Sequence, residues 1–151
     1  MTLLNLNGDM GESFGRYTIG DDAALITVVK SASVACGFHA GDPCVMARAV
    51  ELAKEHGVSI GAHPSFPDLQ GFGRRPLRMR PDEIENMVAY QIGALAGVAA
   101  RYGVRVTHVK PHGALNNVAH HDAECAGAIA RAIRAVDRDL IFVANACSEM
   151  V

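Results

Sequence analysis

The sequence of 151 residues has no tryptophan, few other aromatic residues, only three lysines and no long hydrophobic run. Its formal net charge is −2, so it lacks the basic surface with which proteins hold a nucleic acid backbone. No apolar stretch approaches the roughly 20 residues that span a bilayer, and the N-terminal residues do not resemble a signal peptide. We therefore expect a cytoplasmic protein that binds neither nucleic acid nor a membrane.

Cysteine is present but lacks the spacings that bind metal or form redox pairs. Cys36, Cys44, Cys125 and Cys147 include no CxxC pair and no zinc-finger spacing to a pair of histidines. We expect all four to be reduced thiols that are buried or half-buried as packing residues. The alternative for Cys36, which ends an apolar run, is a catalytic nucleophile.

Two common phosphate-binding motifs are also missing. The sequence contains no G-x-x-x-x-G-K-[ST] loop. Its first glycine-rich segment, residues 7–15, carries carboxylates where a phosphate would bind. Both observations argue against a self-contained nucleotide site of the P-loop or Rossmann type.

What the sequence does contain is an alternation of strand and helix patterns in a chain that is half apolar. Strands followed by helices imply crossover connections and a parallel sheet, either open or closed into a barrel. No linker or low-complexity tract interrupts the pattern, so we expect one domain over residues 1–151. The predicted strands cover residues 3–6, 33–36, 58–62, 104–109 and 140–144, and the predicted helices follow caps at Asp21 and Asp42, begin at Pro81, and cover residues 122–136.

Titratable residues follow each of the first four predicted strands. The carboxyl ends of parallel strands meet at one face, which is where barrel enzymes place their active sites. Four successive loops that each deliver such a group therefore predict one shared site. The groups are Asp9 and Glu12 after the first strand, His39 and Asp42 after the second, His63 and Asp68 after the third, and Lys110 and His112 after the fourth.

The chemistry of this set is open between two readings. Carboxylates and imidazoles can activate water and transfer protons, and Lys110 can stabilise an oxyanion or a phosphate. The alternative is a divalent metal that activates water, with Asp9, His39 and His63 as candidate ligands. Spacing alone does not separate these readings.

Other polar residues have simpler interpretations. We expect Asp42 to cap a helix and Asp68 to act as a turn residue, whatever else they do. His56 is predicted to lie at a helix C-terminus, and His120 and His121 at a solvated helix entry. Lys110, between an apolar strand and a proline, is expected to point into the cleft.

An arginine-rich loop covers residues 71–80. Guanidinium groups suit carboxylates and phosphates, so Arg74 and Arg75 are candidates for anion or partner binding. The alternative is an ordinary solvated loop.

Five motifs, taken together and in this order, resemble the LamB/YcsF family. They are N-x-D-x-G-E-S-F-G at residues 7–15, A-C-G-F-H-A-G-D at 35–42, G-A-H-P-x-x-P-D at 61–68, G-F-G-R-R at 71–75, and V-K-P-H-G-A-L at 109–115. The resemblance implies an irregular (β/α) barrel of the glycoside hydrolase/deacetylase type. It also implies the A subunit of a 5-oxoprolinase, which opens the lactam of 5-oxo-L-proline to L-glutamate with ATP as co-substrate, together with subunits B and C. The site carried over onto matching positions is Asp9, Glu12, His39, His63, Lys110 and His112.

The sequence departs from the family pattern in two side chains and in length. Gly8 replaces a typical cysteine, and Asn116, a candidate substrate contact, replaces a typical tyrosine. A (β/α) barrel needs about 250 residues, so we expect one truncated after about five strands, with the C-terminal part of the family barrel missing. Two alternatives to the oxoprolinase follow: a metal-dependent amide or acetyl hydrolase, and an inactive truncated member that persists as a fragment or a homo-oligomer.

Overall fold

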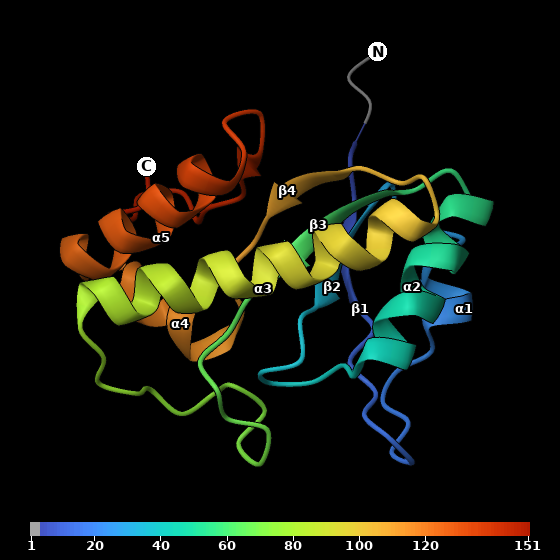
Figure 1. Ribbon diagram of the computed structural model, residues 1–151, viewed down its shortest axis with the longest axis horizontal. Coiled ribbons are helices and arrows are strands. Elements are labelled where there is room, and N and C mark those ends of the chain that lie inside the picture. The colour runs from blue at the N-terminus through green and yellow to red at the C-terminus, as the bar shows by residue number, and fades with distance from the viewer. Residues whose placement is uncertain (1–3) are drawn as a thin grey trace.

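A computed structural model describes residues 4–151 and shows a parallel five-stranded sheet with helices packed against it (Figure 1). The strands lie side by side in chain order, and each pairs in parallel with the next. Within residues 4–151, β1 and β5 do not pair, so hydrogen bonds do not close the barrel. The predicted α/β fold with five parallel strands is confirmed. The strands are β1 (Asn7–Met10), β2 (Ser31–Ala35), β3 (Ser59–His63), β4 (Val106–Val109) and β5 (Ile141–Phe142).

Helix ends follow the predicted capping residues. The Asp42 carboxylate accepts the backbone N–H groups of Cys44 and Val45 at 2.8 and 2.9 Å, and Pro43 is the first residue of α2. Gly57 has φ +64° beyond the end of that helix, as a left-handed C-terminal residue should. The helices are α1 (Asp22–Leu25), α2 (Pro43–Glu55), α3 (Pro81–Arg101), α4 (Gly113–Ala119) and α5 (Ala123–Val136).

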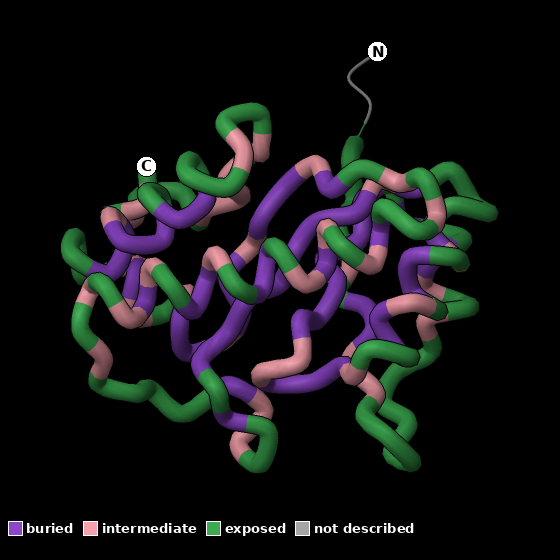
Figure 2. The backbone as a smooth tube through the Cα atoms, viewed as in Figure 1, coloured by how far each residue is buried: buried purple, intermediate pink, exposed green. Residues whose placement is uncertain are grey.

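Alternation along the strands separates a core face from a site face. Met10, Val34 and Ile60 belong to the hydrophobic core shared with the helices, and strands β2, β3 and β4 form the buried centre of the molecule (Figure 2). Side chains at the alternate strand positions point to the opposite face, where the Ser33 hydroxyl donates a hydrogen bond to Asn7 Oδ1. The sheet therefore covers its apolar face with helices and presents a polar face to the site.

The first strand was predicted at the wrong position. The prediction placed it over residues 3–6; residue 3 lies outside the described part, and Leu4 and Leu6 are exposed. The pairing strand is Asn7–Met10, which aligns with residues 31–34 of β2. An apolar run was mistaken for the strand, because the real one alternates polar residues that face the site. Asp9 therefore belongs to a strand and not to the loop after it.

Three further predictions need correction. The helix after Asp21 is only four residues long, and Val28, three residues beyond its end, is exposed. Helix α4 was missed, because its residues were interpreted as a loop that carries a motif. Cys36 and Cys125 are buried as predicted, but Cys44 and Cys147 are exposed. Within residues 4–151, no helix combines the length and apolar character needed to cross a membrane.

Candidate active site

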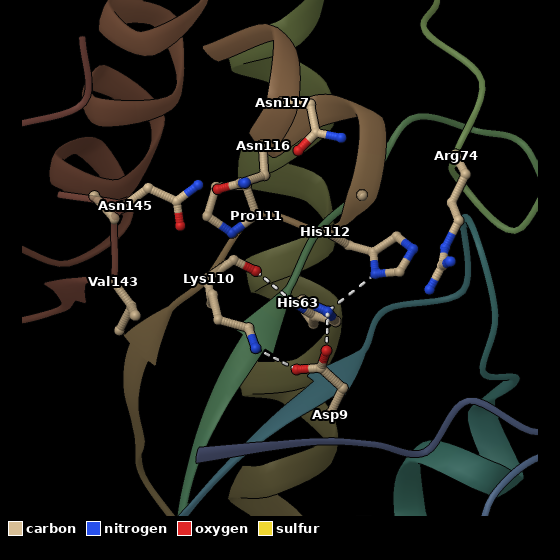
Figure 3. Close-up of a pocket in the computed structure, with 12 residues that line it drawn as sticks. Asp9, His63, Arg74, Lys110, Pro111, His112, Asn116, Asn117, Val143 and Asn145 are labelled. Atoms are coloured by element: carbon tan, nitrogen blue, oxygen red, sulfur yellow. Dashed lines mark hydrogen bonds and ion pairs between the residues drawn. The ribbon is translucent and has the colours of Figure 1, made fainter. Parts of the chain in front are cut away.

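The ends of β1 and β3, the loops after β3, β4 and β5, and helix α4 surround a cavity of about 550 Å³ at the carboxyl ends of the strands (Figure 3). Its lining combines one carboxylate, two imidazoles, two cations and three amides with a few apolar groups. Of the predicted site residues, Asp9, His63, Arg74, Lys110, His112 and Asn116 line it, together with Pro111, Gly113, Asn117, Val143, Ala144 and Asn145.

Asp9 and Lys110 form an ion pair across the cavity floor. The Lys110 ammonium donates to Asp9 Oδ1 and, at 3.0 Å, to Asn7 Oδ1. The other Asp9 oxygen lies 3.4 Å from His63 Nε2. Burial alone would raise the pKa of Asp9, but His63 and Lys110 outweigh it and hold that pKa well below its usual range. Asp9 is therefore ionised at neutral pH, and Lys110 points into the cavity as predicted (Figure 3).

Behind this pair, three histidines pack together. The rings of His39 and His112 stack with centroids 3.8 Å apart, and His63 meets both edge-on. Glu12 Oε1 lies 3.0 Å from His39 Nε2. Burial lowers the pKa of His112 to about 4 and also lowers that of His39, so both rings are neutral at pH 7. Glu12 and His39 thus join the predicted site as a layer beneath the cavity lining.

Two backbone carbonyls fix the tautomers of His63 and His112. A carbonyl oxygen only accepts, so His63 Nδ1 donates to the Lys110 carbonyl at 2.5 Å. By the same reasoning, His112 Nε2 donates to the Phe72 carbonyl at 2.8 Å. The remaining nitrogens, His63 Nε2 and His112 Nδ1, lie 3.1 Å apart. In neutral rings both of these atoms carry lone pairs, which point into the cluster.

The turn that holds His112 has an unusual backbone. Phe72 has φ +54°, a left-handed conformation that a bulky residue rarely adopts, and its ring packs edge-on against His39 and His112. Next to it, Gly73 has φ +64°, and a Cβ there would collide with the Ser65 hydroxyl. The glycine is therefore needed for close packing. This turn places the Phe72 carbonyl against the imidazole, and such strained residues cluster at functional sites.

The structure separates the two candidate arginines. Arg74 lines the cavity, and its guanidinium carbon lies 5.6 Å from the centre of the Phe72 ring. Arg75 turns away and pairs with the buried carboxylate of Asp68, which also accepts the Gly71 N–H. These contacts hold the pKa of Asp68 at about 2. Asp68 is the predicted turn residue, and Arg75 is its structural partner outside the cavity.

Several residues near the site were not singled out from the sequence. Asn7 accepts hydrogen bonds from both Ser33 and Lys110. Its position two residues before Asp9 places both on one face of a strand, a signal that the misplaced first strand concealed. His108, buried on β4 two residues before Lys110, has the same signal. Asn117 and Asn145 carried no motif.

Cys36 does not fit the alternative of a nucleophile. Its thiol is buried and donates to the Val34 carbonyl at 3.2 Å. Burial raises the pKa of Cys36 to about 12, so the reactive thiolate is scarce at neutral pH.

Known proteins place this architecture in a family. The model of the LamB/YcsF family matches residues 4–151. The chain belongs to the LamB/YcsF family. It is 60% identical over 150 residues to the 5-oxoprolinase A subunit of Azoarcus sp. (strain BH72), covering 99% of this chain and 59% of that protein. It is also 60% identical over 148 residues to the protein of the same name from Methylococcus capsulatus, covering 98% of this chain and 57% of that protein.

A solved structure of a similar protein has the same fold as this chain. The lactam utilization protein of Thermus thermophilus superimposes with a TM-score of 0.97 at 47% identity, covering 99% of this chain and 60% of that one. This LamB/YcsF chain therefore spans about three-fifths of the length of the relatives it matches. These relatives are named as the A subunit of a 5-oxoprolinase and as a lactam utilization protein.

Proposed function

We propose that this chain is the A subunit of an ATP-dependent 5-oxoprolinase and supplies the lactam-opening site to an assembly with subunits B and C. The observation that carries the proposal is the meeting of Asp9, His63 and Lys110 in one cavity of a chain that is 60% identical to a protein named as this subunit. This set combines a water-orienting carboxylate with a cation beside it. Both are needed where an amide carbon is attacked and an oxyanion develops.

The cavity offers partners for both polar ends of 5-oxoproline. Among the described lining residues, Lys110 and Arg74 are the cations. Arg74, at the rim, suits the substrate carboxylate, because a guanidinium binds a carboxylate through two parallel hydrogen bonds. Lys110, at the floor, is placed for the lactam oxygen or for a phosphate attached to it. The side-chain amide of Asn116 also lines the cavity (Figure 3).

The reaction balances as two linked hydrolyses. The lactam oxygen attacks the γ-phosphorus of ATP, and ADP leaves. Water oriented by Asp9 adds to the ring carbon, the carbon–nitrogen bond breaks, and the ring nitrogen takes a proton, leaving an acyl phosphate. A second water releases phosphate and L-glutamate. Phosphorylation makes the lactam carbon a better electrophile, and Lys110 stabilises the charge on the phosphorylated oxygen.

The test mixes the purified chain with subunits B and C and supplies 5-oxoproline and ATP. We expect glutamate and phosphate to form together, and we expect Lys110→Met to lower kcat by at least about 100-fold. The longer Azoarcus relative serves as the positive control. If that control is active and this chain forms no glutamate, the proposal is wrong and an inactive family member remains. Glutamate formed without ATP would instead favour a simple amide hydrolase.

A further inference from the structure

We propose that Glu12, His39, His63 and His112 form a binding site for one divalent metal ion of the Zn²⁺ class. In this cluster, called the imidazole cluster below, His63 and His112 line the cavity, and Glu12 and His39 lie behind them. The four residues come from the loops or strand ends of β1 to β4. The inference concerns the proposed active site but does not depend on 5-oxoproline or ATP being its substrates.

Potential ligand atoms converge in the imidazole cluster. One potential ligand atom from each of the four residues lies within 4.8 Å of the other three. The shorter separations are 3.0 Å between Glu12 and His39, 3.1 Å between His63 and His112, and 3.8 Å between Glu12 and His112. Ligand atoms around a tetrahedral Zn²⁺ are about 3.3 Å apart, given metal–ligand bonds of about 2.0–2.1 Å. Three of the six separations are therefore within about 0.5 Å of that spacing, and the others do not exceed 4.8 Å.

Hydrogen bonds to the backbone set the direction of the lone pairs of His63 and His112. The carbonyls of Lys110 and Phe72 take the N–H groups of His63 and His112 and so turn both lone pairs toward each other. Two lone pairs 3.1 Å apart repel, and either a proton or a metal ion between them removes that repulsion. Histidines that bind metals characteristically donate their other ring N–H to a carbonyl or carboxylate, which is the arrangement here.

Glu12 and His39 form the buried half of the imidazole cluster. The His39 side chain is fully buried, and in the described part of the chain its Nδ1 has no hydrogen-bond partner. The other ring nitrogen of His39, Nε2, lies 3.0 Å from Glu12 Oε1, and the same oxygen lies 3.8 Å from His112 Nδ1. A cation held among these atoms would neutralise the carboxylate and use the imidazole. Imidazole nitrogens with one carboxylate favour Zn²⁺ and its neighbours over Mg²⁺ or Ca²⁺.

Asp9 is excluded from this ligand set, in contrast to the sequence-based candidates Asp9, His39 and His63. The four side chains whose ligand atoms converge do not include Asp9, and one oxygen of Asp9 is already bound by Lys110. Glu12 takes its place in the set, and His112 is the ligand that the sequence-based set lacks.

The test measures binding of Zn²⁺ and Co²⁺ to the chelator-treated chain by calorimetry and by the visible absorption of Co²⁺. We expect one equivalent of metal and an absorption spectrum typical of four-coordinate Co²⁺. Glu12→Gln and His112→Gln should weaken Zn²⁺ binding by at least about 100-fold. His121→Gln, at an exposed histidine, should leave it unchanged, and Asp9→Asn should change it by less than about 10-fold.

Two outcomes would overturn the proposal: no stoichiometric binding by the folded chain, or a larger loss in Asp9→Asn than in Glu12→Gln. Circular dichroism of each metal-free variant establishes that it is folded, and Glu12→Gln guards against misfolding because it keeps the side-chain shape. Binding is read without substrate or ATP. A failed oxoprolinase assay therefore leaves this result standing, and a failed binding assay leaves the proposed reaction standing.

Discussion

Arg74 and Arg75 are neighbours in the chain, but their guanidinium groups lie in different surroundings. Arg74 belongs to the cavity lining, whereas Arg75 is held by Asp68 outside it. The sequence indicates only that two arginines follow a glycine-rich turn. The direction of each side chain depends on its tertiary contacts, with Asp68 for Arg75 and with the Phe72 ring for Arg74.

We expect Arg75→Gln to lower the free energy of unfolding at pH 7 and to lose that effect in acid. Asp68 has a pKa of about 2 in the folded chain, against an ordinary 3.8. A depressed carboxyl pKa stabilises the fold above the ordinary value, and the stabilisation is lost as the pH falls through about 2. Urea unfolding of both proteins at pH 7, 4 and 2.5 checks this. A difference that is the same at all three would contradict the assignment.

Arg74→Gln is the matched variant with the opposite expectation. Its stability should equal that of the parent, because Arg74 makes no ion pair in the described part of the chain. In the assembled enzyme, its KM for 5-oxoproline should rise roughly tenfold or more, the effect of losing a charged hydrogen bond. Urea unfolding and steady-state kinetics separate the two arginines. A loss of stability without a change in KM would place Arg74 outside the binding site.

Residue by residue, the sequence predicted the membership of the site better than its internal arrangement. Asp9, His63, Lys110 and His112 do meet, because parallel strands deliver their following residues to one face. The pairing of Asp9 with Lys110 could not be read from the sequence. Nor could the histidine tautomers, because backbone carbonyls from two separate loops set them.

Among the elements, helix α3 does more than cover the sheet. Gln91, fully buried on this helix, accepts the Ser65 N–H and donates to the Ser65 carbonyl, both at 2.9 Å. Ser65 lies two residues after His63, so these two bonds tie the loop after β3 to the helix. Helical periodicity puts Gln91 on the buried face of α3 with Met87 and Val88, but periodicity does not reveal that the partner of Gln91 is a loop.

We expect Gln91→Leu to destabilise the fold by about 2–4 kcal/mol, because it leaves a buried N–H and a buried carbonyl without partners. Gly93→Ala, on the same helix, is the control. A Cβ at Gly93 meets no atom within 4 Å, so alanine should raise stability by up to about 1 kcal/mol through helix propensity. Chemical denaturation measures both. A neutral Gln91→Leu would show that Ser65 finds other partners.

At the same scale, caps were predictable and short elements were not. Asp42, Pro43 and Gly57 mark the ends of α2 through local hydrogen bonds and dihedral angles, which the sequence encodes directly. Strand β1 depends on pairing with β2, and α4 on packing within the fold. Local patterns do not record such tertiary contacts, which is why an apolar run was mistaken for the first strand.

For the molecule as a whole, the polar face of the sheet is a buried layer as well as a site. His108 lies in it on β4, packed so closely over β3 that a Cβ on Gly61 would collide with its ring. Asn7, Thr107, His63 and Lys110 surround the ring, and no carboxylate is hydrogen-bonded to it in the described part of the chain. The fold therefore buries a neutral imidazole.

The whole fold should lose stability as the pH falls from 7 to 4, above the range in which Asp9 and Asp68 take up protons. Burial, with smaller effects from Lys110 and His63, lowers the pKa of His108 to about 4, whereas the unfolded chain binds that proton near 6.5. Between these values the unfolded state holds more protons, so the free energy of unfolding falls as the pH falls. His108 alone should contribute on the order of 2–3 kcal/mol between pH 7 and pH 4. Urea midpoints measured across this range should therefore fall steadily.

His108→Gln should reduce the slope of the urea midpoint against pH whatever its own stability, and His121→Gln should leave that slope unchanged. Equal slopes in the two variants would mean that His108 is already charged in the folded chain, and the buried layer would then need a different electrostatic account.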